Sequence, residues 1–402
     1  MKCFDLIIIG GGASGIMAAL AAKKNNPNCS VLIVEALNKL GKKILVSGNG
    51  RCNILNAGQY AYFGDALFAE QVLQKDAFTQ LRAFFLELGL PIVLDEAGRA
   101  YPSTFQAETV MEVLQLALHR NGIQVYLEEA IQSIKKVENT FLIHSATNTY
   151  QAKKVIVAVG GIASPKHGSN GNLYEQIKCL GFTFTSHKPA LCPLLSDMKE
   201  LRTLAGIRVK ANLTILDVYT CKGEVLFTEY GISGIAGMQM ARFCDGKVNL
   251  HLDLRPTCNM ENFRQEDIAE ILMQRLSSFP QDAAITLLTG LLPSKLAKVI
   301  LRRSVHGIDQ KLFKDIIKND TIAIAKEIMH FIVHITGLKG YDFAQVSAGG
   351  LECQQVNAKT LESKLKGLYF TGEILNVDGD CGGFNLMFAF KSGYLAGIHA
   401  SK

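Results

Sequence analysis

Three glycines near the start of the chain have the spacing of a dinucleotide-binding turn. Gly10, Gly12 and Gly15 form a G-x-G-x-x-G pattern that follows an apolar run at residues 4–9. The first glycine permits a tight turn, the second lets the backbone approach a pyrophosphate, and the third allows close packing of a helix on a strand. A helix that begins there would offer unpaired N–H groups and the positive end of its dipole to the phosphates.

An acidic residue stands where the ribose of such a nucleotide is expected. Glu35 lies twenty residues beyond Gly15, at the end of a predicted strand over residues 30–35. A carboxylate there accepts hydrogen bonds from the adenosine ribose diol and would repel a 2′-phosphate. The alternative is a glycine turn with a chance acidic residue. This half of the pattern does not separate FAD from NAD.

A second glycine–acid pair lies near the far end of the chain. Gly372 and Glu373 end an apolar run at residues 367–371, and a polar segment at 378–385 precedes a predicted helix at 384–400. This order suits the ribityl and flavin end of FAD, because donors at a helix start stabilise negative charge on the reduced ring. An ordinary loop before a C-terminal helix is the alternative.

The most unusual stretch, residues 42–53 (KKILVSGNGRCN), places a cation, an amide and a thiol on one loop after the predicted ribose-binding strand. Ligands of a doubly wound fold lie beyond the carboxyl ends of the strands, so this loop would face the cofactor. Arg51, Cys52 and Asn53 are therefore the candidate catalytic residues, and a polar surface loop is the alternative. A thiolate at Cys52 could act as a nucleophile or proton donor if Arg51 lowered its pKa. We favour the simpler interpretation, in which Cys52 packs the loop against the ring.

The elements that must position these residues alternate between strands and helices. Strands are expected at 4–9, 30–35, 123–128, 141–144, 155–159, 207–218, 223–229, 247–254 and 367–371, and helices at 14–25, 66–89, 106–121, most of 261–335, and 384–400. The simplest arrangement is an α/β fold whose Rossmann-like FAD-binding domain is formed from both chain ends. The predicted domains are 1–190 plus 341–402 for FAD binding, an inserted β-rich domain at 191–260, and a helical subdomain at 261–340.

Composition limits the classes of function. The chain has 402 residues, 48% of them hydrophobic, and its 42 basic and 36 acidic residues give a net charge of +6 without a basic block. This predicts a globular protein with more than one core, and a solvated surface rather than a nucleic-acid track. The ten cysteines and nine histidines form no zinc pattern, so no metal is expected. The first residues lack a signal peptide and no apolar run reaches the ~18 residues of a membrane span, which predicts a cytoplasmic protein.

Four separated motifs resemble those of the BaiN/RdsA (YhiN-type) family of NAD(P)/FAD-dependent oxidoreductases. They are GGGASG at 10–15, KKILVSGNGRCNILN at 42–56, TEYGISG at 228–234, and the long C-terminal stretch at 358–397. The resemblance implies an FAD domain built from both termini, with an inserted β-rich domain and a helical subdomain. Within the third motif, Thr228, Gly231, Ser233 and Gly234 would turn a strand into a helix near the mouth of the active site, or serve only as a structural turn.

The resemblance also implies which residues hold the cofactor. Ala13, Ser14 and Glu35 would contact the ADP half of FAD, Lys43, Ser47, Arg51 and Asn53 would lie near the pyrophosphate or isoalloxazine, and Glu373, Asn385 and Leu386 would approach the ribityl chain and ring. With the turn glycines Gly10, Gly12 and Gly15, and with Gly372, these form the predicted FAD site. Cys381 departs from the family pattern, which is expected to carry a residue such as threonine there.

The motifs together predict an FAD-dependent oxidoreductase that transfers a hydride between flavin and a small organic substrate, and the resemblance points to an enone or an amine. The substrate would bind between the FAD domain and the insert. Whether NADH, NADPH or the substrate reduces the flavin is left open by the sequence. Because no second G-x-G-x-x-G is present, a nicotinamide nucleotide would bind transiently, without a Rossmann domain of its own. The alternatives are a flavin-containing binding or regulatory protein and an RNA-modifying enzyme. The oligomeric state is not predicted.

The glycine turn, Glu35 and the Gly372–Glu373 pair predict the identity of the cofactor. We expect the purified protein to be yellow, with one FAD per chain, and to release FAD rather than FMN on boiling, as chromatography of the supernatant would reveal. A colourless protein that does not take up added FAD would contradict the whole assignment.

Overall fold

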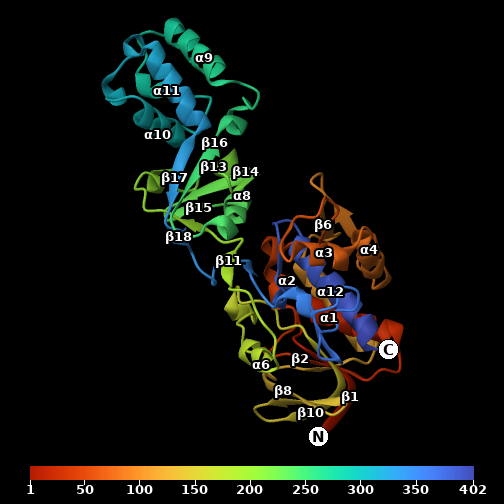
Figure 1. Cartoon of the computed structure of the whole chain (residues 1–402). Helices are drawn as coiled ribbons and strands as arrows, with labels where there is room; N and C mark the ends of the chain where they lie inside the picture. The colour runs from red at the N-terminus through yellow and green to blue at the C-terminus, as the bar shows by residue number, and fades with distance from the viewer. The chain divides into compact units, whose positions relative to one another are not determined.

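The computed structural model describes all 402 residues and divides them into two compact units (Figure 1). The first unit consists of Met1–Pro189 and Ala344–Lys402, and the second of Ala190–Phe343. The two ends of the chain therefore fold together, and the second unit is inserted between them.

A seven-stranded sheet forms the core of the first unit. Its strands are β7 (Gln124–Tyr126), β2 (Val31–Val34), β1 (Lys2–Ile9), β10 (Thr149–Val157), β9 (Thr140–Ser145) and β8 (Ile131–Val137) in spatial order, with β20 (Leu368–Phe370) on β10. β1 lies parallel to β2 and β10, and β20 lies parallel to the last residues of β10. Continuous apolar runs such as that of β1 are typical of parallel strands covered on both faces. The sheet thus unites the first and last strands of the chain.

Two helices from opposite ends of the chain lie side by side in this unit (Figure 1). α1 (Ala13–Asn25) follows the glycine turn, and α12 (Phe384–Ala400) closes the chain. A Cβ at Gly393 would lie 2.2 Å from the backbone oxygen of Ser14, and one at Gly397 would lie 2.1 Å from that of Ala18. The two backbones therefore meet where α12 carries no side chain.

Shorter elements complete the first unit. They are α2 (Lys42–Val46), α3 (Ala66–Leu73), α4 (Ala77–Glu87), α5 (Ala107–Arg120) and α6 (Tyr174–Cys179), the small sheet β3–β6–β5 (Leu55–Asn56, Arg99–Pro102, Ile92–Leu94), the pair β21–β4 (Val377–Gly379, Tyr62–Gly64), and β19 (Val346–Ala348), which pairs with β11 (Lys188–Ala190). The β21–β4 pair joins the C-terminal segment to the residues that follow the 42–53 loop.

A second seven-stranded sheet forms the inserted unit. Its order is β17 (Phe331–Ile335), β16 (Val248–Asp253), β13 (Arg208–Ile215), β14 (Tyr219–Thr228), β15 (Gly231–Ser233), β12 (Leu194–Leu195) and β18 (Gly337–Leu338), and its neighbours are antiparallel. Helices α7 (Leu201–Leu204), α8 (Ile235–Gln239), α9 (Gln265–Ser278), α10 (Ser294–Ser304) and α11 (Lys318–Met329) belong to the same unit. Neither unit contains a helix with the length and apolar character needed to cross a membrane.

The predicted fold class, a Rossmann-like α/β domain made from both chain ends, is confirmed. One part of the helical prediction was wrong, because residues 331–335 form the edge strand β17. Phe331, Val333 and Ile335 are buried and the residues between them are not, which is the period-two pattern of a strand. The predicted helix over 66–89 is also two helices, interrupted beside Gln74, whose φ is +55°.

The contact between α1 and α12 leads to a prediction about stability. Gly397→Ala adds a methyl group that would lie against the Ala18 carbonyl, so the helices must separate at a cost of about 1–3 kcal/mol. We expect a lower urea midpoint for the transition that reports the first unit. Gly337→Ala is the matched control, because a Cβ there meets nothing within 4 Å. An unchanged midpoint for Gly397→Ala would show that the close approach is not needed.

Candidate functional site

The glycine turn leaves open space at the start of α1. A Cβ at Gly15 would lie 2.0 Å from the backbone oxygen of Gly10, and one at Gly10, whose φ is +107°, would lie 2.4 Å from that of Ala158. At Gly12, which caps α1, a Cβ would meet nothing within 4 Å. The N–H groups of the first helical turn have no partner within the helix. This geometry suits a phosphate group that approaches the backbone at Gly12.

The carboxylate of Glu35 is held in place by two backbone donors. The N–H of Gly11 donates to one oxygen at 2.7 Å, and the N–H of Leu37 donates to the other at 2.9 Å. A carboxylate offers about four acceptor sites, so further hydrogen bonds from a ribose remain possible. Gly168 lies beside this group, since a Cβ there would be 2.9 Å from Leu37 and 4.0 Å from Glu35.

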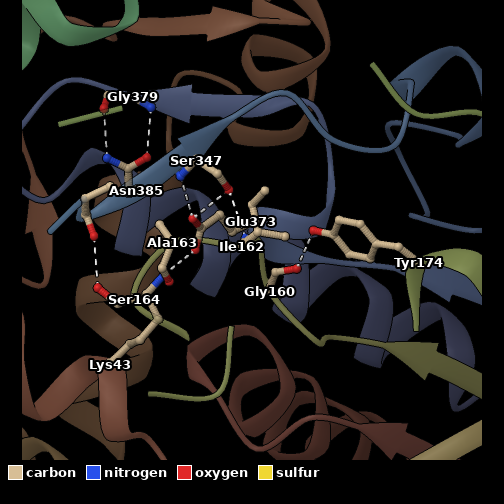
Figure 2. A network of polar contacts seen from close by, with 11 residues as sticks. Lys43, Gly160, Ile162, Ala163, Ser164, Tyr174, Ser347, Glu373, Gly379 and Asn385 are labelled. Carbon is tan, nitrogen blue, oxygen red and sulfur yellow. Dashed lines mark hydrogen bonds and ion pairs between the residues drawn. The ribbon is translucent and has the colours of Figure 1, made fainter. Parts of the chain in front are cut away.

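Glu373 is the centre of a second polar network, which Figure 2 shows from close by. Lys43 forms an ion pair with one carboxylate oxygen at 2.6 Å and also donates to the backbone oxygen of Ala163 at 3.4 Å. The backbone N–H of Ser347 donates to the other oxygen at 2.9 Å, and the Ser347 hydroxyl donates to it at 3.3 Å. These contacts fix a carboxylate and a cation from segments 330 positions apart in the sequence.

Ser347 and the loop after β10 were missed by the sequence analysis. Ser347 is almost fully buried, and its hydroxyl accepts a hydrogen bond from the N–H of Ile162 at 3.2 Å. The Ser164 hydroxyl donates to the backbone oxygen of Ala344, and the Tyr174 hydroxyl donates to that of Gly160 (Figure 2). The sequence signal that could have pointed to this segment is Ser-Ala-Gly-Gly at 347–350, because paired glycines mark a tight turn, and both have positive φ in the structure.

Asn385 uses its amide to hold the loop that precedes α12. Its Oδ1 accepts from the N–H of Gly379 and its Nδ2 donates to the oxygen of the same residue, both at 2.8 Å (Figure 2). Leu386 is partly buried against the core. Asn385 thus fixes the backbone at Gly379 and Asp380, and its predicted contact with the ribityl chain stays a prediction.

The 47–53 segment brings a buried amide next to the same loop. The Oδ1 of Asn53 is buried and has no hydrogen-bond partner, and it would lie 2.7 Å from a Cβ at Gly383. The hydroxyl of Ser47 donates to the backbone oxygen of Ile44 at 2.7 Å. Arg51 is exposed to solvent. Of the four predicted flavin-side residues, Lys43 and Asn53 are therefore held near the C-terminal segment, and Ser47 supports its own loop.

Cys52 does not have the properties of a reactive thiol. Its side chain is fully buried and its φ is +54°. Burial raises the pKa of the Cys52 thiol to about 11, and Arg51 is not among the groups that affect it. The hypothesis that Arg51 lowers this pKa was wrong, because burial dominates. Burial also raises the pKa of Cys381, and all ten cysteines are free thiols.

These residues fit FAD. The open backbone at Gly12 suits the pyrophosphate. Glu35 and Glu373 follow β2 and β20 at the carboxyl ends of the parallel strands of one sheet, where a dinucleotide binds. The unpartnered Oδ1 of Asn53 is an acceptor that needs a donor, and the N3–H of an isoalloxazine is one. The arrangement can orient a flavin between the two ends of the chain.

The HI0933-like protein Rossmann domain family matches residues 4–399. The chain is 35% identical to the 3-dehydro-bile acid delta(4,6)-reductase of Clostridium scindens, with 98% of each chain covered. It is 28% identical to a ribosomal RNA dihydrouridine synthase of Haemophilus influenzae, again with 98% of each covered.

Solved structures with less sequence similarity share the fold. The 3-ketosteroid-delta4-(5alpha)-dehydrogenase of Rhodococcus jostii RHA1 gives a TM-score of 0.51 at 14% identity, covering 100% of this chain and 97% of the other. The 3-ketosteroid delta1-dehydrogenase of Sterolibacterium denitrificans gives 0.52 at 12% identity, with both chains fully covered.

The burial of Cys52 and the exposure of Arg51 predict different effects of mutation. Cys52→Ser should keep FAD and most of the rate of flavin reduction, because a protonated buried thiol only packs the loop. Arg51→Ala should impair flavin binding or reduction far more, since it removes the cation predicted to face the cofactor. Flavin content and stopped-flow reduction measure both effects. If Cys52→Ser lost turnover while FAD stayed bound, the thiol would take part in the reaction and this prediction would be wrong.

Proposed function

This chain belongs to the HI0933-like Rossmann-domain family and is an FAD-dependent oxidoreductase, and on that premise we propose that it reduces a carbon–carbon double bond conjugated to a carbonyl. The observation that carries the proposal is the 35% identity, over 98% of both chains, to a reductase of 3-dehydro-bile acids. The substrate class proposed is a small organic enone. When bound, FAD would supply the hydride for this reduction.

The residues of the site orient the cofactor and set its electrostatic surroundings. The turn at Gly12 and the start of α1 would hold the pyrophosphate, and Glu35 would hold the ribose. Glu373, fixed by Ser347 and Lys43, would hold the ribityl chain without having to reorganise. The ammonium of Lys43 would neutralise the Glu373 carboxylate in this partly buried site, so that the carboxylate would repel negative charge on the cofactor less than it would if it were unpaired.

We propose NAD(P)H as the reductant of the flavin. The chain has one G-x-G-x-x-G turn, at Gly10–Gly15, and the proposed FAD site uses it. A nicotinamide nucleotide would therefore bind only transiently, on a surface without a dinucleotide fold of its own.

A second candidate is the reduction of uridine in RNA. It is supported by the dihydrouridine synthases of Haemophilus influenzae and Escherichia coli, at 28% and 27% identity over 98% of this chain. The chemistry is related, because the reduced bond of uridine is also conjugated to a carbonyl. Lys295, Lys298 and Arg302 lie exposed along α10, although Arg302 is paired with Asp309. Binding to ribosomal RNA with a steep salt dependence would favour this candidate over the first.

An anaerobic titration tests the proposed reaction. NADH or NADPH is expected to remove the yellow absorbance of the purified protein, and a 3-oxo-4-ene steroid acid added afterwards is expected to restore it while being reduced. Free FAD at the same concentration is the control for reaction without the protein. Absorbance that does not respond to either nucleotide, or that oxygen restores but the enone does not, would contradict the proposal.

A further inference from the structure

Lys391, on α12, is the one lysine or arginine of the chain that is buried, with 1% of its surface exposed. Its ammonium donates a hydrogen bond to the Oε1 of Gln80 on α4, a helix that packs against α12 (Figure 1). Gln80 is its one hydrogen-bond partner. Because an ammonium has three donors, two of them remain without a partner from the protein.

The groups around Lys391 do not give it a counter-charge in direct contact. The Nε2 of Gln80 donates to the carboxylate of Asp76, so an amide separates the cation from this acid. The carboxylate of Glu87 is already paired with Lys24. Burial lowers the pKa of Lys391, and Asp76 opposes this effect only in part. A buried charge without a direct counter-charge is unfavourable, so an anion that reached Lys391 would stabilise it.

A cavity gives such an anion room beside the ammonium. Lys391 lines a cavity of about 400 Å³ between α4 and the last turns of α12, a volume within the range of small-molecule sites. Phe84, Tyr394 and Leu395 form an apolar part of its lining. The rings of Phe84 and Tyr394 pack edge to face with their centroids 5.3 Å apart. One cavity thus combines a cation that lacks an anion with an aromatic and aliphatic wall.

This cavity lies on a different side of α12 from the contacts that shape the cofactor site. Gly393 and Gly397 face the backbone of α1, and the hydroxyl of Ser392 accepts a hydrogen bond from the N–H of Gly372 at 3.0 Å. Lys391 faces α4 instead. The proposed FAD site therefore leaves this lysine without a role.

We propose that the cavity between α4 and α12 is a binding site for a small aliphatic carboxylate, which accepts hydrogen bonds from Lys391 and packs its apolar chain against Phe84 and Leu395. The carboxylate supplies the missing counter-charge and acceptors for the two unused donors. An inorganic anion would do the same but would leave the apolar wall without a partner. The ligand is not a substrate, and the site does not depend on the proposed function.

The direct test compares hexanoate with hexanamide, which has the same chain but no charge, by titration calorimetry with the protein as purified. The wild type should bind hexanoate more tightly. Lys391→Met keeps an unbranched side chain and should weaken hexanoate binding about tenfold, the loss of one charge-assisted hydrogen bond, while leaving hexanamide unchanged. Lys75→Met removes an exposed cation two residues before α4 and controls for net charge.

Four results would overturn the proposal. The wild type does not bind hexanoate, or binds it no more tightly than hexanamide. Lys391→Met weakens both compounds equally, which would give the lysine only a structural role. Lys75→Met has as large an effect as Lys391→Met, so that overall charge is responsible. Inorganic phosphate binds as tightly as hexanoate, which would make the apolar wall irrelevant.

A second measurement uses the wild type alone, so it does not depend on the folding of a variant. Cyanate carbamoylates unprotonated lysine amines, and peptide mass spectrometry reports the extent of modification at each lysine. Hexanoate should slow the modification of Lys391 and leave that of Lys75 unchanged, and hexanamide at the same concentration should protect Lys391 less. Equal protection by the two compounds, or a Lys391 that cyanate never reaches, would contradict a carboxylate site in this cavity.

Discussion

The close approach of α12 to α1 is the constraint on which the cofactor site depends. Glycine at positions 393 and 397 lets the last helix of the chain lie against the backbone of the first, at Ser14 and Ala18. Gly372 takes part as well, because a Cβ there would lie 2.6 Å from the Ser14 hydroxyl oxygen. With this contact in place, β20 pairs with β10, and the carboxylate of Glu373, which follows β20, lies at the same sheet edge as the glycine turn.

Two carboxylates of the proposed cofactor site are oriented in the same way. Glu35 and Glu373 each accept a hydrogen bond from at least one backbone N–H, which fixes the orientation of the group before any ligand binds. They differ in charge balance, since Glu373 has Lys43 as a partner at 2.6 Å and Glu35 has no ion pair. The site therefore has a neutralised end and an anionic end, which suits a cofactor with a diol at one end and a ring that gains negative charge at the other.

The family shares one fold among different substrates. Relatives of similar length are a bile-acid reductase and dihydrouridine synthases of ribosomal RNA. Fold alone does not decide between these activities, because function depends on the groups that meet the substrate.

The sequence alone determined the fold class and predicted the glycine turn between the first strand and the first helix, because both depend on short-range patterns. The spacing of Gly10, Gly12 and Gly15, the apolar run before them, and Glu35 at the end of the next strand are all local signals. It failed at residues 331–335, where a strand of period two follows a helical segment directly. Only the tertiary structure brought Ser347 and Lys43 to Glu373 and buried Cys52 deeply enough to raise its pKa. Those contacts join residues up to 330 positions apart, and burial and partner choice at that separation are decided by packing, which no local pattern records.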